Sequence, residues 1–169
     1  AYYERPLHRP GEDDEYGGGR VTEILVRPLF SAFFPELARL YQPCSGECAG
    51  RRDILELLPF AAGYGIETGM LIDIVSRFGS EVIAQINLDK RVHRNQSTTA
   101  LGKMGFEIIH AFITRLRSTE RASFSEELYE EYKKLVCGPS VYRLEEIPTQ
   151  LNERPPMRTI PEYRELRRL

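Results

Sequence analysis

A run of three glycines followed by an arginine and a threonine could bind an anion. Gly19, Arg20 and Thr22 stand where a helix is predicted to begin. Glycines let the backbone approach a ligand closely, and the N-terminus of a helix directs free N–H groups and positive potential at the same place. The segment therefore predicts a site for a phosphate ester. The alternative is a flexible loop in which Arg20 forms an ordinary salt bridge.

A second candidate is a carboxylate in the first turn of a predicted helix. Glu67 follows the turn Gly63-Tyr64-Gly65. A carboxylate in that position can reach a bound hydroxyl and orient or deprotonate it. The alternative, that Glu67 only complements the helix dipole, stays open from the residues alone.

A third candidate is the polar loop that follows a predicted strand. It contains Arg91, His93, Arg94 and Asn95. Open α/β sheets bind ligands at the carboxyl ends of their strands. His93 could be a neutral metal ligand or a donor to a diphosphate, the two arginines could balance phosphate charge, and Asn95 could donate to a carboxylate or hydroxyl. The alternative is a solvated basic loop.

The elements that must position these groups are mostly helices. Apolar residues at three- and four-residue spacing predict helices over 20–40, 51–58, 66–78 and 97–117, with interruptions at Pro28 and Pro35. The apolar stripe of the third helix is expected along Ile66, Met70, Ile74 and Phe78. Gly79 is expected to end that helix in a left-handed conformation.

The remaining segments are predicted to contain little regular structure apart from one strand and one more helix. Alternating side chains predict a strand over 81–88. Ser123 and Glu126 form a capping-box signal for a helix to about residue 136. Residues 1–19 are predicted to form a loop, and the proline-rich residues 139–169 an extended C-terminal tail with at most a short helix.

One strand is too little sheet for a free-standing α/β domain, and the chain starts with Ala1 in a loop-like run. We therefore expect the α/β class in a helix-rich form with few strands, as a portion of a larger fold. Residues 1–138 are expected to form the main domain part and 139–169 the tail.

Composition excludes several classes of protein. The net charge of −2 gives no general attraction to nucleic acid or to an anionic membrane, and no apolar run approaches the length of a membrane span. The odd number of cysteines, Cys44, Cys48 and Cys137, without a secretion signal favours reduced thiols in a cytoplasm. No second pair of Cys or His residues completes a zinc site.

The order and spacing of several segments resemble the glucosyl-3-phosphoglycerate synthases. The resemblance covers nearly the whole chain, and the segments are Gly17-Gly18-Gly19-Arg20-Val21-Thr22-Glu23, Gln42-Pro43, Ser45-Gly46-Glu47, Gly63-Tyr64-Gly65-Ile66-Glu67, Ala84-Gln85-Ile86-Asn87-Leu88, Arg91-Val92-His93-Arg94-Asn95 and Glu153-Arg154-Pro155-Pro156-Met157. Each segment is weak alone, and together they are specific.

The resemblance implies a GT-A-type (Rossmann-like) glycosyltransferase fold and a cytoplasmic homodimer. It also implies transfer of glucose from UDP-glucose to the 2-hydroxyl of 3-phosphoglycerate, with retention and with a divalent metal, Mg²⁺ or Mn²⁺. By the same resemblance, the acceptor phosphate would be held by Gly19, Arg20 and Thr22, and Asn95 would contact the acceptor. His93 would be a metal ligand, Arg91 would lie near the reacting groups, and Glu67 would position the sugar or the acceptor.

The sequence departs from the family in having no Asp-x-Asp motif, the main metal carboxylates of such enzymes. The nucleotide-binding half and that motif are expected to lie before Ala1, so this acceptor-side portion is expected to have no turnover alone. Two other readings remain. One is a mannosyl-3-phosphoglycerate synthase that uses GDP-mannose, and the other is a non-catalytic phosphate-binding or dimerisation module.

Overall fold

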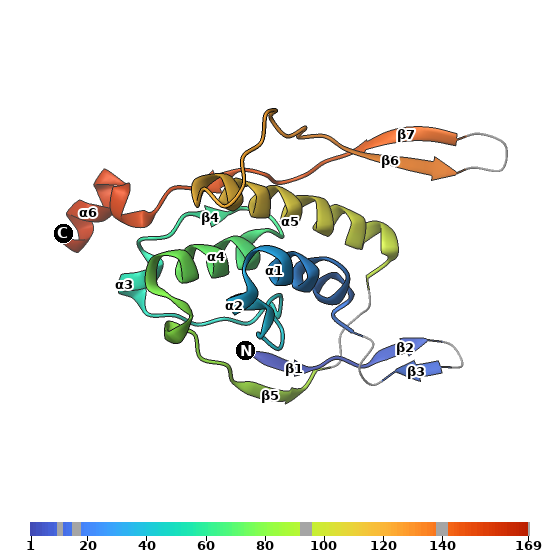
Figure 1. Ribbon diagram of the computed structural model, residues 1–169, viewed down its shortest axis with the longest axis horizontal. Helices are drawn as coiled ribbons and strands as arrows, with labels where there is room; N and C mark the ends of the chain where they lie inside the picture. Colours follow the sequence, from blue (N-terminus) through green and yellow to red (C-terminus); the bar gives the residue numbers. More distant parts are fainter. Residues whose placement is uncertain (10–11, 15–17, 92–95, 138–141, 169) are drawn as a thin grey trace.

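The structure, a computed structural model, describes residues 1–9, 12–14, 18–91, 96–137 and 142–168. Helices form the body of the molecule, and short strands lie around it (Figure 1). In chain order the elements are β1 (Tyr2–Glu4), β2 (Leu7–Arg9), β3 (Glu12–Asp14), the π-helix η1 (Thr22–Val26), α1 (Arg27–Phe33), α2 (Pro35–Ala38), α3 (Arg52–Leu55), β4 (Phe60–Ala61), α4 (Ile66–Phe78), η2 (Ser80–Val82), β5 (Asn87–Lys90), α5 (Thr98–Ser118), β6 (Tyr132–Cys137), β7 (Tyr142–Ile147), β8 (Glu153–Arg154), η3 (Met157–Thr159) and α6 (Pro161–Arg167).

The core lies between α1, α2, α4 and α5. At its centre the ring of Phe112 on α5 contacts the rings of Phe30, Phe33 and Phe34, at centroid distances of 6.3, 5.7 and 5.7 Å. Ile72 on α4 is fully buried in the same cluster. Because a close-packed aromatic cluster resists any change in volume, these helices form a rigid support for the loops at their ends.

The helix predicted over residues 20–40 is interrupted at the second of its two prolines. Helical backbone starts at Arg20, passes through η1 and becomes α1, with Pro28 in the first turn of α1. Phe34 leaves the helical conformation (φ −139°, ψ 64°), and Pro35 begins α2. Proline is tolerated in a first helical turn, where its missing N–H has no intrahelical partner. The predicted interruption at Pro35 is confirmed, whereas the helix continues through Pro28.

The helix α4 has the predicted bounds but not the predicted buried face. Its deeply buried residues include Thr68, Ile72 and Val75, whereas Ile66 is 40% exposed. Ile66 and Ile74 instead line an open apolar groove of about 480 Å³ beside α3 and residues 82–84. Gly79 has the predicted positive φ (82°), but its ψ of 169° is not that of a left-handed helical cap.

A loop was predicted for residues 1–19, but the residues described there form three short strands. The strand predicted over 81–88 begins six residues later. The strand β1 pairs in parallel with β5, and β2 pairs with β3 in an antiparallel hairpin. A β-strand needs a neighbouring strand to hydrogen-bond with. The only strand that pairs with this segment among the described residues is β1, and its three residues lie opposite residues 87–90. Residues 80–82 accordingly form a 3₁₀ turn, η2.

The helix predicted from Ser123 to about residue 136 is absent, and β6 pairs with β7 there instead (Figure 1). Residues 125–131 have no regular structure. The capping-box signal is local, whereas six cross-strand pairs stabilise the hairpin, including Lys133 opposite Glu146 and Lys134 opposite Glu145. Opposite charges on facing positions favour this pairing, and tertiary pairing outweighs the local helix preference. The division of the chain at residue 138 stays a prediction.

The last described residues, 148–168, return to the helical body and are referred to below as the C-terminal strap. The strand β8 pairs with β4, and α6 lies near α3 (Figure 1). The Glu56 carboxylate accepts hydrogen bonds from Tyr163 Oη (2.5 Å) and Arg158 Nε (3.3 Å). The Glu107 carboxylate accepts from the backbone N–H groups of Tyr64 (2.9 Å) and Gln150 (3.0 Å). These buried carboxylates fasten the strap to the helices.

Candidate functional site

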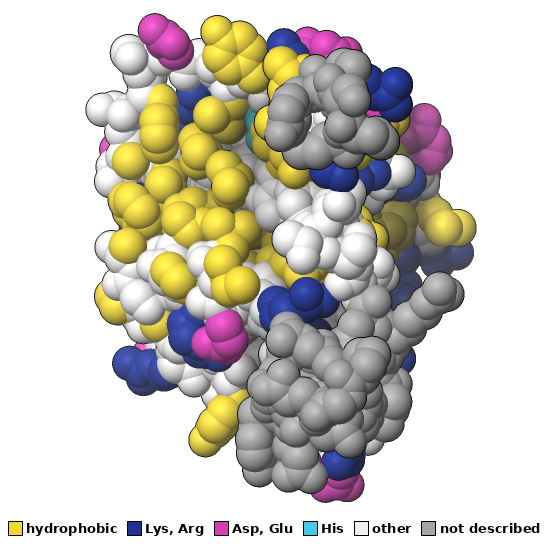
Figure 2. Space-filling view, turned by 90° about the vertical axis from the view of Figure 1, so that its right-hand side faces the viewer, with side chains coloured by type: hydrophobic (Ala, Val, Ile, Leu, Met, Phe, Trp, Pro, Cys, Tyr) yellow, Lys and Arg dark blue, Asp and Glu magenta, His cyan; other side chains and the backbone are white. Residues whose placement is uncertain are grey.

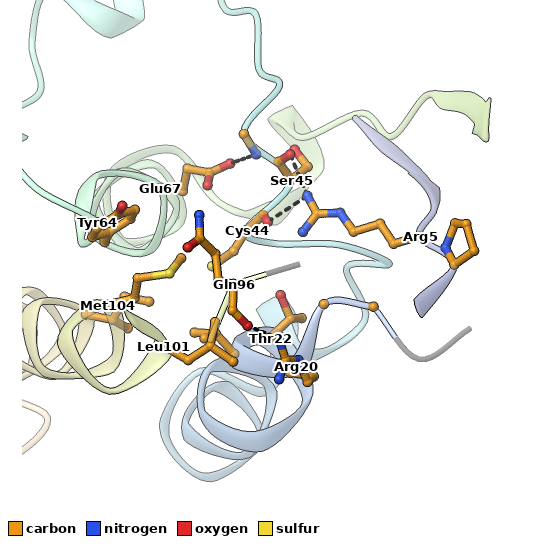
Figure 3. A pocket seen from close by; sticks show the side chains of 16 residues that line it. Arg5, Arg20, Thr22, Cys44, Ser45, Tyr64, Glu67, Gln96, Leu101 and Met104 are labelled. Atoms are coloured by element: carbon orange, nitrogen blue, oxygen red, sulfur yellow. Dashed lines mark hydrogen bonds between the residues drawn. The ribbon is translucent and has the colours of Figure 1, made fainter. Parts of the chain in front are cut away.

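A polar pocket of about 330 Å³ opens where the glycine-rich segment meets the start of α4 (Figure 3). Its walls come from five parts of the chain that are far apart in the sequence. They are Arg5 and Pro6, the segment 18–22, the turn 44–46, the first turn of α4 with Tyr64 and Glu67, and Gln96 with Leu101, Met104 and Ile108 of α5. The pocket therefore joins two of the three segments singled out from the sequence.

The glycine-rich wall requires glycine at two positions for different reasons. At Gly18 an added Cβ would stand 2.3 Å from Arg5 Cβ and 2.4 Å from Arg5 O, so the two backbones could not approach as they do. Gly19 has a φ of 72°, which L-residues with side chains rarely adopt. Together these positions bend the chain into the start of the helix at Arg20.

Arg20 and Thr22 lie on this wall as predicted. The guanidinium of Arg20 donates to the Gln96 carbonyl, and Thr22 is 2% exposed. Figure 3 shows both side chains below the pocket, on the first turn of the helix that continues into η1. The first N–H groups of a helix lack intrahelical partners, and together with the Arg20 guanidinium they favour a bound anion such as a phosphate.

Glu67 lies on the opposite side of the pocket. Its Oε1 accepts a hydrogen bond from the Gly46 N–H at 2.8 Å. Burial raises the pKa of the Glu67 carboxyl above its ordinary value, although the Gly46 N–H and the charge of Arg5 both act to lower that pKa. A half-buried carboxylate with a raised pKa is a suitable acceptor for the proton or hydrogen bond of an alcohol.

Arg91 lies beside the pocket but is not among the residues that line it. It forms an ion pair with Glu47, and its guanidinium stacks over the Tyr3 ring at 5.6 Å. The predicted site residues His93 and Asn95 lie outside the described residues. Gln96, the first described residue after them, lines the pocket and accepts a hydrogen bond from Arg20. The roles of Arg91, His93 and Asn95 stay predictions.

The described residues do not form a metal site by themselves. Among them, no group of three or more His, Cys, Asp or Glu side chains is placed to hold an ion. Cys44 borders the pocket, but burial raises the pKa of its thiol to about 12, and its Sγ lies 3.7 Å from Thr68 Oγ1. A thiol that stays protonated is a poor metal ligand.

Reasoning from the residues alone missed Arg5 and the turn 44–46 as parts of this pocket. The Arg5 guanidinium donates to the carbonyls of Cys44 (3.2 Å) and Ser45 (2.6 Å), about forty residues away in the chain. No periodicity or local motif indicates such a contact. The Ser45-Gly46-Glu47 segment was singled out only through the family resemblance.

Comparisons with known proteins found relatives that match nearly the whole chain. No family model matches the chain. The chain is similar to the glucosyl-3-phosphoglycerate synthase of Petrotoga mobilis, with 47% identity over 167 residues that cover 98% of this chain and 51% of that protein.

Two solved structures share the fold. One is the Mycobacterium tuberculosis glucosyl-3-phosphoglycerate synthase in complex with Mn²⁺, uridine diphosphate and phosphoglyceric acid, with a TM-score of 0.73, 38% identity, and coverage of 93% of this chain and 49% of that one. The other is the mannosyl-3-phosphoglycerate synthase of Rubrobacter xylanophilus, with a TM-score of 0.78, 36% identity, and coverage of 94% and 52%.

The chain spans about half the length of these relatives. The similarity covers 93% or more of the chain in each comparison. By sequence and by fold, the chain belongs with the glucosyl-3-phosphoglycerate synthases, and it corresponds to a helix-rich, C-terminal portion of their glycosyltransferase fold.

Proposed function

We propose that this chain provides the acceptor side of a retaining glycosyltransferase that moves glucose from UDP-glucose to 3-phosphoglycerate. The observation that carries the proposal is one pocket that joins an anion-binding helix start, at Gly19, Arg20 and Thr22, to the Glu67 carboxylate. 3-Phosphoglycerate carries its phosphate on C3 and its hydroxyl on the adjacent carbon, C2, so an anion site and a carboxylate in one pocket match both groups. The names of the relatives support the same substrates.

In the proposed reaction the acceptor phosphate binds at Gly19, Arg20 and Thr22, and Glu67 orients the 2-hydroxyl. The hydroxyl oxygen bonds to the anomeric carbon as the bond from that carbon to the diphosphate breaks. The departing diphosphate takes the hydroxyl proton, so no covalent enzyme intermediate is needed. Glu67 acts by positioning the hydroxyl, and holding the hydroxyl in the geometry of attack lowers the activation barrier of the transfer.

We further propose that the donor nucleotide and a divalent ion, Mg²⁺ or Mn²⁺, are bound mainly by residues that this chain does not contain. The sequence has no Asp-x-Asp motif, and the described residues offer no cluster of metal ligands. This chain alone, given UDP-glucose, Mg²⁺ and 3-phosphoglycerate, is therefore expected to yield no product. Clear turnover would show that the chain is sufficient.

A chimera that supplies the donor side from a relative tests whether this chain can support product formation. Residues 1–169 would replace the matching 167-residue segment of the Petrotoga mobilis enzyme, with which they share 47% identity. Formation of glucosyl-3-phosphoglycerate by the chimera, and its loss in an Arg20→Ala chimera, would support the proposal. An Arg39→Ala chimera is the matched control, because Arg39 is an exposed arginine that does not line the pocket.

A mannosyl-3-phosphoglycerate synthase is the second candidate function, since the Rubrobacter xylanophilus enzyme has a comparable TM-score. Calorimetry with 3-phosphoglycerate does not separate the two functions, because both use the same acceptor. Product analysis of the chimera is also uninformative here, since its donor side comes from another protein. Turnover of the longer protein that contains this chain, with UDP-glucose and with GDP-mannose, decides between them.

We also propose a cytoplasmic homodimer. No helix in the described part of the chain is long and apolar enough to cross a bilayer. Figure 2 shows apolar side chains gathered in one area of a molecular face, and large apolar side chains such as Ile24 (77%) and Phe124 (43%) stay exposed. Exposed apolar surface is typical of interaction sites. Light scattering after size exclusion would measure the mass, and a monomer at micromolar concentration would argue against the dimer.

A further inference from the structure

Arg5 links the two strands at the start of the chain to the pocket. It lies between β1 and β2, and its Nη2 donates to Tyr3 Oη at 2.7 Å, to Ser45 O at 2.6 Å and to Cys44 O at 3.2 Å. Its Nε is buried without a hydrogen-bond partner among the described residues. Because its Nη2 is hydrogen-bonded to these groups, the Arg5 guanidinium can hold the carbonyls of Cys44 and Ser45 in a fixed orientation beside the pocket.

The peptide group between Ser45 and Gly46 is hydrogen-bonded at both ends (Figure 3). Its carbonyl accepts from Arg5 at 2.6 Å, and its N–H donates to Glu67 Oε1 at 2.8 Å. The peptide dipole is therefore aligned between a positive and a negative side chain, and hydrogen bonds in such a chain strengthen one another. The orientation of this one peptide decides whether Glu67 faces a donor or a carbonyl oxygen.

Gly46 makes that orientation reversible. Its φ is 78°, in the region that glycine adopts without strain, and an added Cβ would meet no atom within 4 Å. Rotation of the Ser45–Gly46 peptide would turn the carbonyl toward Glu67 and remove its N–H donor. Because glycine at 46 leaves both orientations open, another group must select one, and Arg5 and the Tyr3 hydroxyl hold the Ser45 carbonyl.

We propose that Arg5 is a positioning residue of the acceptor pocket: through the Ser45–Gly46 peptide it fixes the orientation of the Glu67 carboxylate that faces the acceptor. The functional part of this inference rests on the proposed glucosyl transfer, whereas the link from Arg5 to Glu67 does not. A purely structural Arg5 would lower the Glu67 pKa through its charge alone, and its loss would leave the Gly46 N–H directed at Glu67.

Nuclear magnetic resonance tests the link directly. The Gly46 amide proton should shift with pH as Glu67 titrates, and Glu67→Gln should abolish that step. In Arg5→Met the pH-dependent shift of the Gly46 amide should shrink by at least half, because the Gly46 N–H would no longer be held toward Glu67. The Glu67 carboxyl signal should titrate at higher pH, because that hydrogen bond and the positive charge of Arg5 both lower its pKa. Arg20→Ala is the matched control on the other wall, and it should leave the step unchanged. A folded Arg5→Met variant with the step and midpoint of the wild type would overturn the proposal.

A second measurement needs no substitution. In the wild-type chain the Arg5 Nε signal should shift with the same midpoint as Gly46, since one peptide couples the two side chains. Independent behaviour of the two signals would overturn the proposal even if Arg5→Met failed to fold.

Binding and turnover separate this inference from the proposed function. If 3-phosphoglycerate does not bind the wild-type chain in calorimetry, the proposed function fails while the Gly46 step still reports on the link. In an active chimera, Arg5→Met should lower kcat by a factor on the order of 10 to 100, with a smaller change in KM for 3-phosphoglycerate. Arg5→Lys, which keeps a charged donor, should recover part of the lost kcat. An unchanged kcat in Arg5→Met would refute the positioning role.

Discussion

The carboxylates of the pocket and of the C-terminal strap differ in how completely they are paired. Glu56 accepts from Tyr163 and Arg158, and Glu107 from two backbone N–H groups. Glu67 accepts from the backbone N–H groups of Gly46 (2.8 Å) and Ser45, with no side-chain donor among the described residues, and it lines the pocket. Hydrogen bonding, above all from Tyr163, lowers the pKa of Glu56, whereas burial raises the pKa of Glu67. The strap uses its charges to hold the fold, and the pocket keeps one carboxylate available for a ligand.

The largest expected effect is on the strap side. Arg115 is 2% exposed and pairs with Asp73, at 3.0 Å, and with Glu153. Arg115→Met would leave the buried Asp73 carboxylate without its partner, so the free energy of unfolding should fall by about 3–5 kcal/mol. Urea denaturation measures the loss.

Arg51→Met is the control for that experiment, since Arg51 pairs with Asp53 at the surface and exposed pairs contribute little. If Arg115→Met were no less stable than Arg51→Met, the strap would not depend on its buried charges, and the contrast with the pocket would be lost.

A pocket substitution should change binding and leave stability intact. Arg20→Ala removes a charged donor from the anion site, which should weaken 3-phosphoglycerate binding by about 1.5–3 kcal/mol, or roughly 10- to 100-fold. Calorimetry measures the affinity and a thermal melt the stability. A large fall in stability with unchanged affinity would place Arg20 with the structural charges instead.

The smallest expected effect is on how the stability of the fold depends on pH, where Glu56 and Glu67 should differ. The lowered pKa of Glu56 stabilises the fold above the ordinary glutamate pKa, and that contribution is lost on acidification. The raised pKa of Glu67 has the opposite sign, because its ionised form costs stability at neutral pH and the cost disappears as pH falls.

Between pH 7 and pH 4, Glu56→Gln should therefore lose stability less steeply than the wild type, and Glu67→Gln more steeply. Thermal melts across this range measure both slopes. Parallel slopes in the two variants would mean that the two carboxylates do not differ in the way their surroundings indicate.

Local signals predicted the helices that carry the pocket. The bounds of α4 follow from Gly63-Tyr64-Gly65 before it and Gly79 after it, and Ser97 caps α5 by accepting from the Ala100 N–H at 3.2 Å. The same signals placed Gly19, Arg20, Thr22 and Glu67 at helix starts, where the structure brings them into one pocket.

Long-range pairing accounts for most of what local signals did not predict. The helix that the Ser123 capping box predicts is replaced by the β6–β7 hairpin. In the described part of the chain, no strand pairs with residues 81–86. The contact of Arg5 with the 44–46 turn joins residues about forty positions apart. Periodicity describes which face of a helix is apolar but not which apolar face is covered, so the exposure of Ile66 could not be foreseen.

The strap has a consequence for how the chain folds as it is made. Glu56 contacts Tyr163, which is 107 residues further along the chain. On a ribosome, α3 emerges long before α6 exists, so the Glu56 carboxylate must remain hydrated until the strap has been made. Contacts of such long sequence separation form slowly. The helical body is therefore expected to assemble first, and the strap to close over it later.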